Sequence, residues 1–266
     1  MSKHLINTVK RSPLANTLAL HDFANTTYDL KGWVAYMANL FKEYGLEPTR
    51  MGVSAPSIKS GKMKTYIREI KKLDTVDNAT ITGITMQATM NGSDDSHGDE
   101  IFHSCFEVGL GDTNCVLTLD SALVPLDFHI WNKITQQMAI FFQPRYGYGF
   151  QRIYKKGPRW YPFGVCVNLG YEDSERKEIS SWSKTYHSRK YRTGDMRNIY
   201  QLNVLSSAHN QRMVEGMALF DWISADTNRG SLTKLGENLW SWWVKDEEID
   251  LVRAALKPTG ILLCAS

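Results

Sequence analysis

The sequence predicts an α+β protein in which antiparallel sheets are flanked by about five helices. Two observations predict this class. The hydrophobic period changes from helical to alternating after residue 74 and returns to helical after residue 125. The strand-like segments also lack the strict alternation with helices that a doubly wound sheet requires. We therefore expect a single α+β domain over residues 1–266, and if it divides into two lobes we expect their boundary near residues 143–146.

Two helices are predicted in the N-terminal third. In residues 30–44 the apolar side chains recur every three or four positions, Asp29 is placed to cap the start, and Gly45 can end the helix in a left-handed conformation. The second helix spans about residues 62–73, with apolar side chains on one side and four cations on the other. Such a charged side is typical of a solvated helix face.

Alternating segments follow at residues 79–88, 100–108 and 114–119. They are rich in Thr, Ile, Val, Phe and Cys and are separated by Gly, Asp and Asn, which predicts antiparallel strands. A third helix is expected from Pro125 to Phe142, where Pro144 prevents its continuation.

The C-terminal half mixes short elements. Aromatic residues alternate around glycines in residues 143–169, which predicts two strands joined by a Gly-Pro turn. We then expect a helix at 174–186, a strand at 198–205, a hairpin at 232–244 turning at Gly236 or Asn238, a helix at 246–256 and a closing strand at 261–264. In the hairpin, alternation places Trp240 and Trp242 on the face opposite Trp243.

Cysteine usage and hydropathy predict a cytoplasmic protein with no membrane partner. The four cysteines show no C-x-x-C spacing and lie in apolar or alternating runs, which favours buried free thiols. Cys105 and Cys115 are the one pair that consecutive strands could bring together as a disulfide. The chain has neither an apolar region of signal-peptide length after its first cations nor about eighteen consecutive apolar residues for a membrane span.

Charge is divided along the chain although the net charge is only +3. Residues 74–127 hold ten carboxylates and no Lys or Arg, whereas residues 145–200 hold twelve cations and five acids. We call these the acidic and the basic segments. A division of this kind concerns partners and steering rather than catalysis.

The basic segment is the main candidate for a binding surface, because its cations are interleaved with aromatic side chains. Arg, Tyr and Trp are enriched in protein–protein hot spots, and the same mixture also tracks phosphates and stacks bases. A third hypothesis is that the basic segment pairs with the acidic one inside the protein. The candidate partner-binding residues are Arg145, Tyr146, Tyr148, Arg152, Lys155, Lys156, Arg159, Trp160, Tyr186, Arg189, Lys190, Tyr191 and Arg192.

Catalytic and metal-binding patterns are incomplete. The loop S-D-D-S-H-G-D-E at 93–100 offers Asp94, Asp95, His97 and Asp99 as oxygen and imidazole ligands, but its spacing matches neither an EF-hand nor H-E-x-x-H. We interpret it as a polar turn. Because a G-x-S-x-G elbow, a Walker lysine and a dinucleotide fingerprint are also missing, we expect no catalytic residues, no metal and no cofactor.

The C-terminal half resembles the immunity proteins of bacterial polymorphic-toxin and type VI secretion systems. The resemblance lies in Y-G-Y-G-F at 146–150, G-P at 157–158, N-I-Y-Q-L-N-V-L-S-S-A-H at 198–209, F-D-W-I at 220–223, R-G-S-L at 229–232 and L-W-S-W-W-V at 239–244. It implies an α+β fold without a catalytic constellation. Immunity proteins against nucleases are often acidic, whereas this chain is slightly basic.

The resemblance implies a non-enzymatic protein that neutralises a cognate toxin by direct binding. Aromatic and Arg anchors would then supply the affinity, and charge complementarity the rate of association. The alternative is a nucleic-acid-binding or metal-dependent nucleic-acid-processing protein of phage or mobile-element defence. In that case the basic segment would bind the nucleic-acid backbone, and the metal ligands would be Asp94, Asp95, His97 and Asp99.

Overall fold

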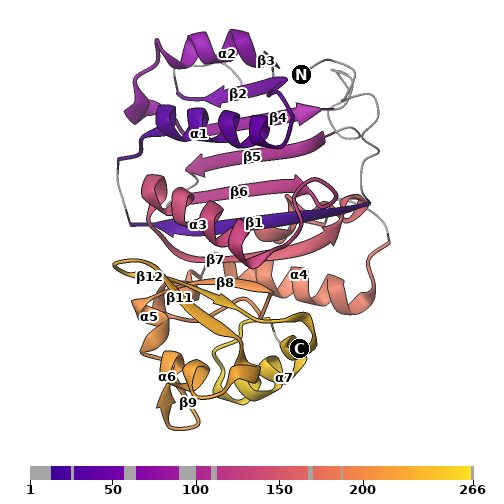
Figure 1. Cartoon of the computed structure of the whole chain (residues 1–266), viewed down its shortest axis with the longest axis vertical. Coiled ribbons are helices and arrows are strands. Elements are labelled where there is room, and N and C mark those ends of the chain that lie inside the picture. Colours follow the sequence, from indigo (N-terminus) through magenta and orange to yellow (C-terminus); the bar gives the residue numbers. More distant parts are fainter. Residues whose placement is uncertain are drawn as a thin grey trace.

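A ten-stranded antiparallel sheet organises the whole molecule (Figure 1), and it confirms the α+β class. The computed structural model describes residues 13–24, 27–56, 64–89, 100–108, 113–166, 170–186 and 188–264. From one edge to the other the strands are β11 (Ser231–Gly236), β12 (Leu239–Trp243), β8 (Leu202–Ser206), β7 (Pro144–Ile153), β1 (Leu14–Phe23), β6 (Thr113–Asp120), β5 (Glu100–Val108), β4 (Gly83–Thr89), β2 (Arg50–Ser54) and β3 (Lys64–Thr65). Two short strands, β9 (Met213–Val214) and β10 (Met217–Ala218), pair separately.

The prediction of about five helices is confirmed in the described part of the chain. Five α-helices have eight or more residues: α1 (Leu30–Glu43), α2 (Tyr66–Leu73), α3 (Phe128–Phe142), α4 (Asp173–Tyr186) and α7 (Asp246–Leu256). Two short ones, α5 (Ser207–Asn210) and α6 (Leu219–Ser224), lie near the C-terminal hairpin. Single 3₁₀ turns are η2 (Asn78–Thr80), η4 (Tyr154–Lys156), η5 (Tyr161–Phe163), η6 (Lys190–Thr193), η7 (Thr227–Arg229) and η8 (Lys257–Thr259).

Local signals fix the helix ends. The Asp29 carboxylate accepts a hydrogen bond from the backbone N–H of Gly32 and caps α1, and Gly45 follows the helix with a φ of 78°. Asp127 caps α3 in the same way, because it accepts from the N–H groups of His129 and Ile130. These caps satisfy backbone donors that the helices cannot satisfy themselves.

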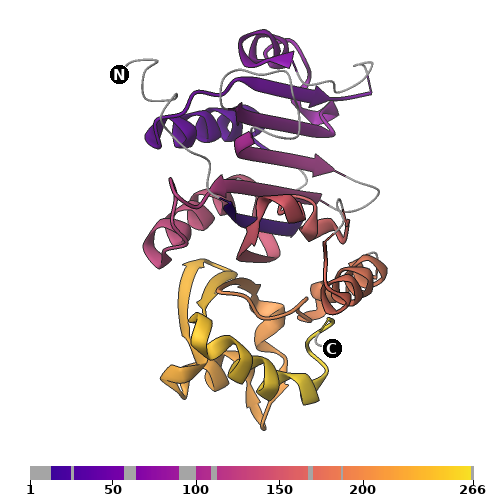
Figure 2. The ribbon, with the colours of Figure 1, turned by 90° about the vertical axis from the view of Figure 1, so that its right-hand side faces the viewer.

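Both faces of the sheet are covered, so the core has two parts. Along β1, Leu18 and Leu20 belong to a cluster that includes α1 and α3, whereas Ala19 belongs to a second cluster that includes α4 and α7. Figure 2 shows α1 and α3 on one side of the strands and α4 on the other. The period of two along a strand therefore distributes its side chains between two cores.

Residues 143–169 do not form the predicted pair of strands. Of the described residues 143–166, β7 is the one strand, and the chain then continues through η4 and η5 instead of returning as a second strand. The reason is that β1 and β8 occupy both edges of β7, which leaves no edge for a hairpin partner. Pro144 thus begins a central strand of the sheet, and a division into two lobes near this point stays a prediction.

Smaller differences have local causes. Helix α2 begins at Tyr66 because Lys64 and Thr65 pair with β2. The segment 261–264 makes one parallel bridge, between Met196 and Leu262, rather than a strand.

The register of β5 and β6 does not align the two cysteines. Cys105 lies opposite Val116, and Cys115 lies opposite Phe106 and is a buried free thiol. Cys264 is buried as expected, whereas Cys166 is exposed, so the prediction of a buried thiol is wrong there.

The C-terminal hairpin is confirmed: β11 and β12 pair across a turn at residues 237 and 238. Trp242 is buried in the cluster that contains α4 and α7, and the half-buried Trp240 packs on the same cluster. Trp243 packs on the opposite cluster, against Phe128. The alternation predicted for the three tryptophans is therefore confirmed.

Candidate functional site

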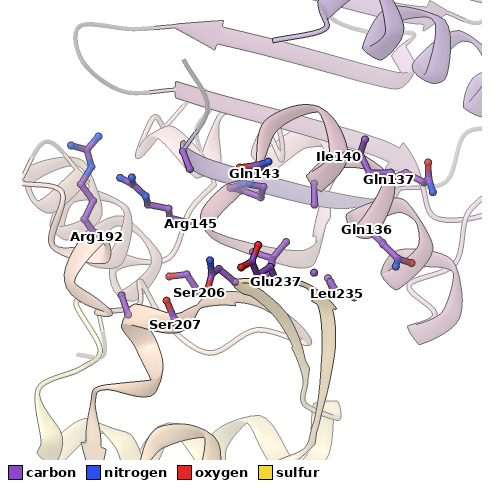
Figure 3. A pocket seen from close by; sticks show the side chains of 17 residues that line it. Gln136, Gln137, Ile140, Gln143, Arg145, Arg192, Ser206, Ser207, Leu235 and Glu237 are labelled. Carbon is purple, nitrogen blue, oxygen red and sulfur yellow. The ribbon is translucent and has the colours of Figure 1, made fainter. Parts of the chain in front are cut away.

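A cleft of about 700 Å³ opens beside the C-terminal hairpin (Figure 3). Its walls are the C-terminal half of α3, the first residues of β7, Arg192 of η6, the junction of β8 and α5, and the tip of the β11–β12 hairpin. Residues far apart in sequence meet here because β7 and β8 are adjacent in the sheet and the hairpin extends it. We call this the hairpin cleft.

Arg145 and Arg192 form the cationic end of the hairpin cleft. Both bind the carboxylate of Asp22: Nη1 of Arg145 lies 3.2 Å from Oδ2, and Nη2 of Arg192 lies 2.5 Å from Oδ1. The Asp22 side chain is only 4% exposed, whereas those of Arg145 and Arg192 are 49% and 34% exposed. A buried carboxylate therefore holds two accessible guanidinium groups close together.

The sequence alone did not identify Asp22 as a residue of this site. It lies outside both charged segments and 123 residues before Arg145, and only the pairing of β1 with β7 brings the two together. Its positive φ of 55° is uncommon for a residue other than glycine, although Asp tolerates this region better than most. Nothing local in the sequence marks this conformation.

The other walls of the hairpin cleft are polar and aliphatic. Helix α3 contributes Gln136, Gln137 and Ile140, and the hairpin tip contributes Glu237 (Figure 3). Ile140 is 65% exposed, although it belongs to α3, whose side chains Trp131, Ile134 and Met138 are buried. A cleft lined by an exposed aliphatic side chain and by arginines has the mixture found at protein interfaces.

Four tyrosines of the predicted binding surface are buried, which corrects the prediction for them. Tyr146, Tyr148, Tyr186 and Tyr191 are at most 8% exposed and pack together in the core that contains α4. The Tyr146 hydroxyl accepts from the backbone N–H of Arg197, and the Tyr186 hydroxyl donates to Asn114. The physical reason is that β7 is a central strand, so the face that carries Tyr146 and Tyr148 is covered rather than solvated.

Arg197 provides internal hydrogen bonds for two of these tyrosines, Tyr146 and Tyr148. Its guanidinium is fully buried and lies 3.8 Å from the Tyr161 ring centre. It donates to the Tyr148 hydroxyl at 2.9 Å and to Glu178 Oε1 at 3.0 Å. Burial raises the pKa of Tyr148 to about 12, against the opposing effect of the Arg197 charge, so its hydroxyl stays protonated at neutral pH. In the sequence, Arg197 is one more cation of the basic segment.

Four of the predicted cations, Arg152, Lys155, Lys156 and Arg159, lie at or beyond the other end of β7. Arg152 and Lys156 both bind Glu175 of α4, at 3.3 and 2.6 Å. Burial tends to raise the pKa of Glu175, but the hydrogen bond from Lys156 helps to hold this pKa below its ordinary value. Arg159 lies over the ring of Trp160, which is 39% exposed, and Lys155 is exposed. Since ten extended residues span about 30 Å, these residues and Arg145 belong to separate surfaces.

The basic loop after α4 lies nearer the hairpin cleft than the Trp160 end. Lys190 is exposed and Arg189 half-exposed, and both precede Arg192 in the same turn. The ion pairs of Arg145, Arg152, Lys156, Arg192 and Arg197 go to Asp22, Glu175 and Glu178, which lie outside residues 74–127. These contacts therefore do not join the basic segment to the acidic one.

The metal candidates Asp94, Asp95, His97 and Asp99 lie outside the described residues. Within the described ranges, no group of three His, Cys, Asp or Glu side chains is arranged to hold a metal ion. None of the described helices is both long and apolar enough to cross a membrane.

Comparisons with known proteins give a likeness of fold. No family model and no curated protein matches the chain. The Pseudomonas aeruginosa T6SS protein PA0821 aligns with a TM-score of 0.56 and 11% identity, over 94% of this chain and 73% of that one. This confirms a likeness to a type VI secretion protein at the level of fold. The toxic C-terminal tip of CdiA from P. aeruginosa in complex with its immune protein aligns over 52% of this chain and 86% of that one, at 13% identity and a TM-score of 0.22, too low to argue from.

Proposed function

We propose that this protein binds a cognate protein of a bacterial toxin or secretion system through the hairpin cleft, and so neutralises it in the manner of an immunity protein. The observation that carries the proposal is the cleft itself, which is lined both by the accessible guanidinium groups that Asp22 holds and by the exposed Ile140. Arg side chains and aliphatic contacts of this kind anchor protein partners. The likeness of fold to a T6SS protein supports the biological setting.

A rigid site of this kind would act by stoichiometric occlusion. The cleft is formed by helix α3 and by the strands β7, β8, β11 and β12 of one sheet. Little of its backbone therefore has to become ordered when a partner binds. A partner segment that enters the cleft would be held away from its own target. Charged side chains around the cleft would affect mainly the rate at which the protein and its partner associate.

Nucleic-acid binding is the second candidate, because guanidinium groups also bind phosphates. The structure favours it less. The described cations of the basic segment divide between the two ends of β7, and several are already bound to carboxylates. A single-strand track requires a continuous cationic groove with exposed aromatic rings, whereas four of the tyrosines are in the core.

The test is capture of the partner from the source cell with a tagged protein, compared with two surface variants. Ile140→Asp places a charge in the cleft, and Leu251→Asp makes the same change on α7, where Leu251 is 61% exposed. We expect the parent and Leu251→Asp to retain one protein that Ile140→Asp loses, with equal melting temperatures for all three. If Ile140→Asp retains that protein, or if the only capture is of salt-sensitive nucleic acid, the proposal is wrong.

A further inference from the structure

We propose that the cationic end of the hairpin cleft is a receptor for one carboxylate, supplied by an Asp or Glu side chain of the partner protein. Arg145 and Arg192 bind this carboxylate, and Asp22 positions them. The inference rests on the protein-binding role proposed above, and it identifies the chemistry that the cleft recognises.

Arg145 has the donors that such a receptor needs. A guanidinium carries five N–H donors in a fixed plane. In the described part of the chain, Arg145 donates one hydrogen bond, through Nη1 to Asp22, while its side chain stays 49% exposed on the cleft wall. The geometry of a guanidinium matches a carboxylate through two parallel hydrogen bonds.

Asp22 supplies the preorganisation. Its two oxygens are shared between the two arginines, one oxygen for each, and its side chain is almost fully buried. A long, flexible arginine normally loses conformational entropy when it binds a ligand. Because Asp22 already restrains both guanidinium groups, that loss occurs on folding rather than on binding.

The charge of this end fits a carboxylate better than a phosphate. Among the three groups of the two ion pairs described here, two guanidinium charges stand against one carboxylate, an excess of one positive charge. A carboxylate carries one negative charge, whereas a phosphate monoester carries about 1.5 to 2. Glu237 on the hairpin tip lines the same cleft, and its negative charge opposes a phosphate more than a singly charged carboxylate.

The dimensions agree with one inserted side chain and its neighbours. A cleft of about 700 Å³ lies within the range of about 300–1,000 Å³ that accommodates compact ligands. Ile140 offers an apolar contact elsewhere on the wall of the same cleft. The expected partner segment therefore presents an acidic residue together with an apolar one.

The test uses arginine side-chain Nε–Hε signals of ¹⁵N-labelled protein. Three probes are titrated: N-acetyl-glutamate N-methylamide, the neutral N-acetyl-glutamine N-methylamide, and inorganic phosphate. The variants are Arg145→Lys, which keeps the charge and loses the planar fork, and Lys190→Gln, which removes a charge from the turn that carries Arg192 but does not line the cleft. Melting temperatures establish that both variants are folded.

We expect the glutamate probe to shift the Arg145 signal saturably and the glutamine probe to leave it in place. Arg145→Lys should weaken glutamate binding about tenfold, since Lys keeps the charge but loses the two parallel hydrogen bonds of the guanidinium, and Lys190→Gln should bind as the parent does. Equal responses to the glutamate and glutamine probes, an unchanged affinity in Arg145→Lys, or tighter binding of phosphate would each overturn the inference.

A second variant tests Asp22 as the positioning residue. Asp22→Asn is nearly isosteric, tolerates the positive φ, and raises the charge of this end to +2. We expect its preference to move from the glutamate probe toward phosphate, and an unchanged preference would contradict the role of Asp22. If the probes fail while Ile140→Asp still abolishes partner capture, the carboxylate receptor is wrong and the protein-binding function stands.

Discussion

Glu178→Gln tests the buried cation at the centre of the second core. Nε of Arg197 lies 3.0 Å from Oε1 of Glu178, the Arg197 side chain is fully buried, and that of Glu178 is 16% exposed. The Glu178 carboxylate also accepts hydrogen bonds from the Tyr161 hydroxyl. The substitution preserves the shape and the acceptor oxygen of Glu178 but removes the charge that compensates Arg197.

The structure sets the size of the effect. Removal of one partner from a buried ion pair costs about 3–5 kcal/mol of unfolding free energy, because the other charge stays buried without compensation. Since Glu178 is partly solvated and Gln keeps one hydrogen bond, we expect a loss at the lower end, about 3 kcal/mol. For a chain of this size, that loss lowers the melting temperature by roughly 6–12 °C.

Guanidinium chloride unfolding of four proteins measures this effect. They are the parent, Glu178→Gln, Arg197→Met and the double variant. The double variant should be more stable than the sum of the single effects predicts, by at least about 1 kcal/mol, because a neutral pair leaves no buried charge. Glu175→Gln is the matched control one turn earlier on α4: its pairs with Arg152 and Lys156 are more exposed, so its loss should be below about 1 kcal/mol.

Equal losses for Glu178→Gln and Glu175→Gln would refute this reasoning. That result would mean that the tyrosine hydroxyls and rings around Arg197 stabilise its charge without the carboxylate. Additive effects in the double variant would lead to the same conclusion.

Three further predictions use the same unfolding measurement. Trp242→Ala should cost about 3–5 kcal/mol, and Trp240→Ala and Trp243→Ala clearly less, because only Trp242 is fully buried; equal losses for the three would contradict the assignment of faces. Burial lowers the pKa of His209 to about 4, whereas an unfolded histidine has a pKa of about 6.5. As the pH falls from about 6.5 to 4, the unfolded chain therefore binds a proton that the folded chain does not, and the free energy of unfolding should decrease by about 3 kcal/mol. His209→Gln should lose much of this pH dependence of stability, and an unchanged pH dependence would contradict the role of His209. Asp127→Ala should destabilise by about 1 kcal/mol through loss of the α3 cap, and Asp127→Asn by much less, so equal losses for the two would argue against capping.

Local signals were sufficient for most helices and strands. The apolar spacing and the caps of α1 and α3 depend on residues within a few positions of each other, and the sequence therefore located them within a few residues. The hairpin of β11 and β12 was also predictable, because a turn joins two adjacent runs. The same logic failed for residues 143–169, where the edges of β7 are occupied by strands distant in sequence.

Alternation in β7 indicated that Tyr146 and Tyr148 share a face, but not that the face is covered. An aromatic strand with a solvated face and one with a helix packed on it have the same period of two. The helix that covers this face, α4, lies more than twenty residues further along the chain. Burial of the aromatic side chains predicted to form a surface therefore depends on tertiary packing.

The charged end of the hairpin cleft depended on tertiary structure in the same way. The sequence alone determined that cations gather in residues 145–200, and it made Arg145 and Arg192 candidates for partner binding, which stays a prediction. Their exposure of 49% and 34% is a property of the folded chain. Their common partner, Asp22, comes from β1 at the far end of the sequence and meets them through the order of strands in the sheet. Charge density is a local property of a chain, whereas the pairing of charges depends on contacts between distant residues, which only packing fixes.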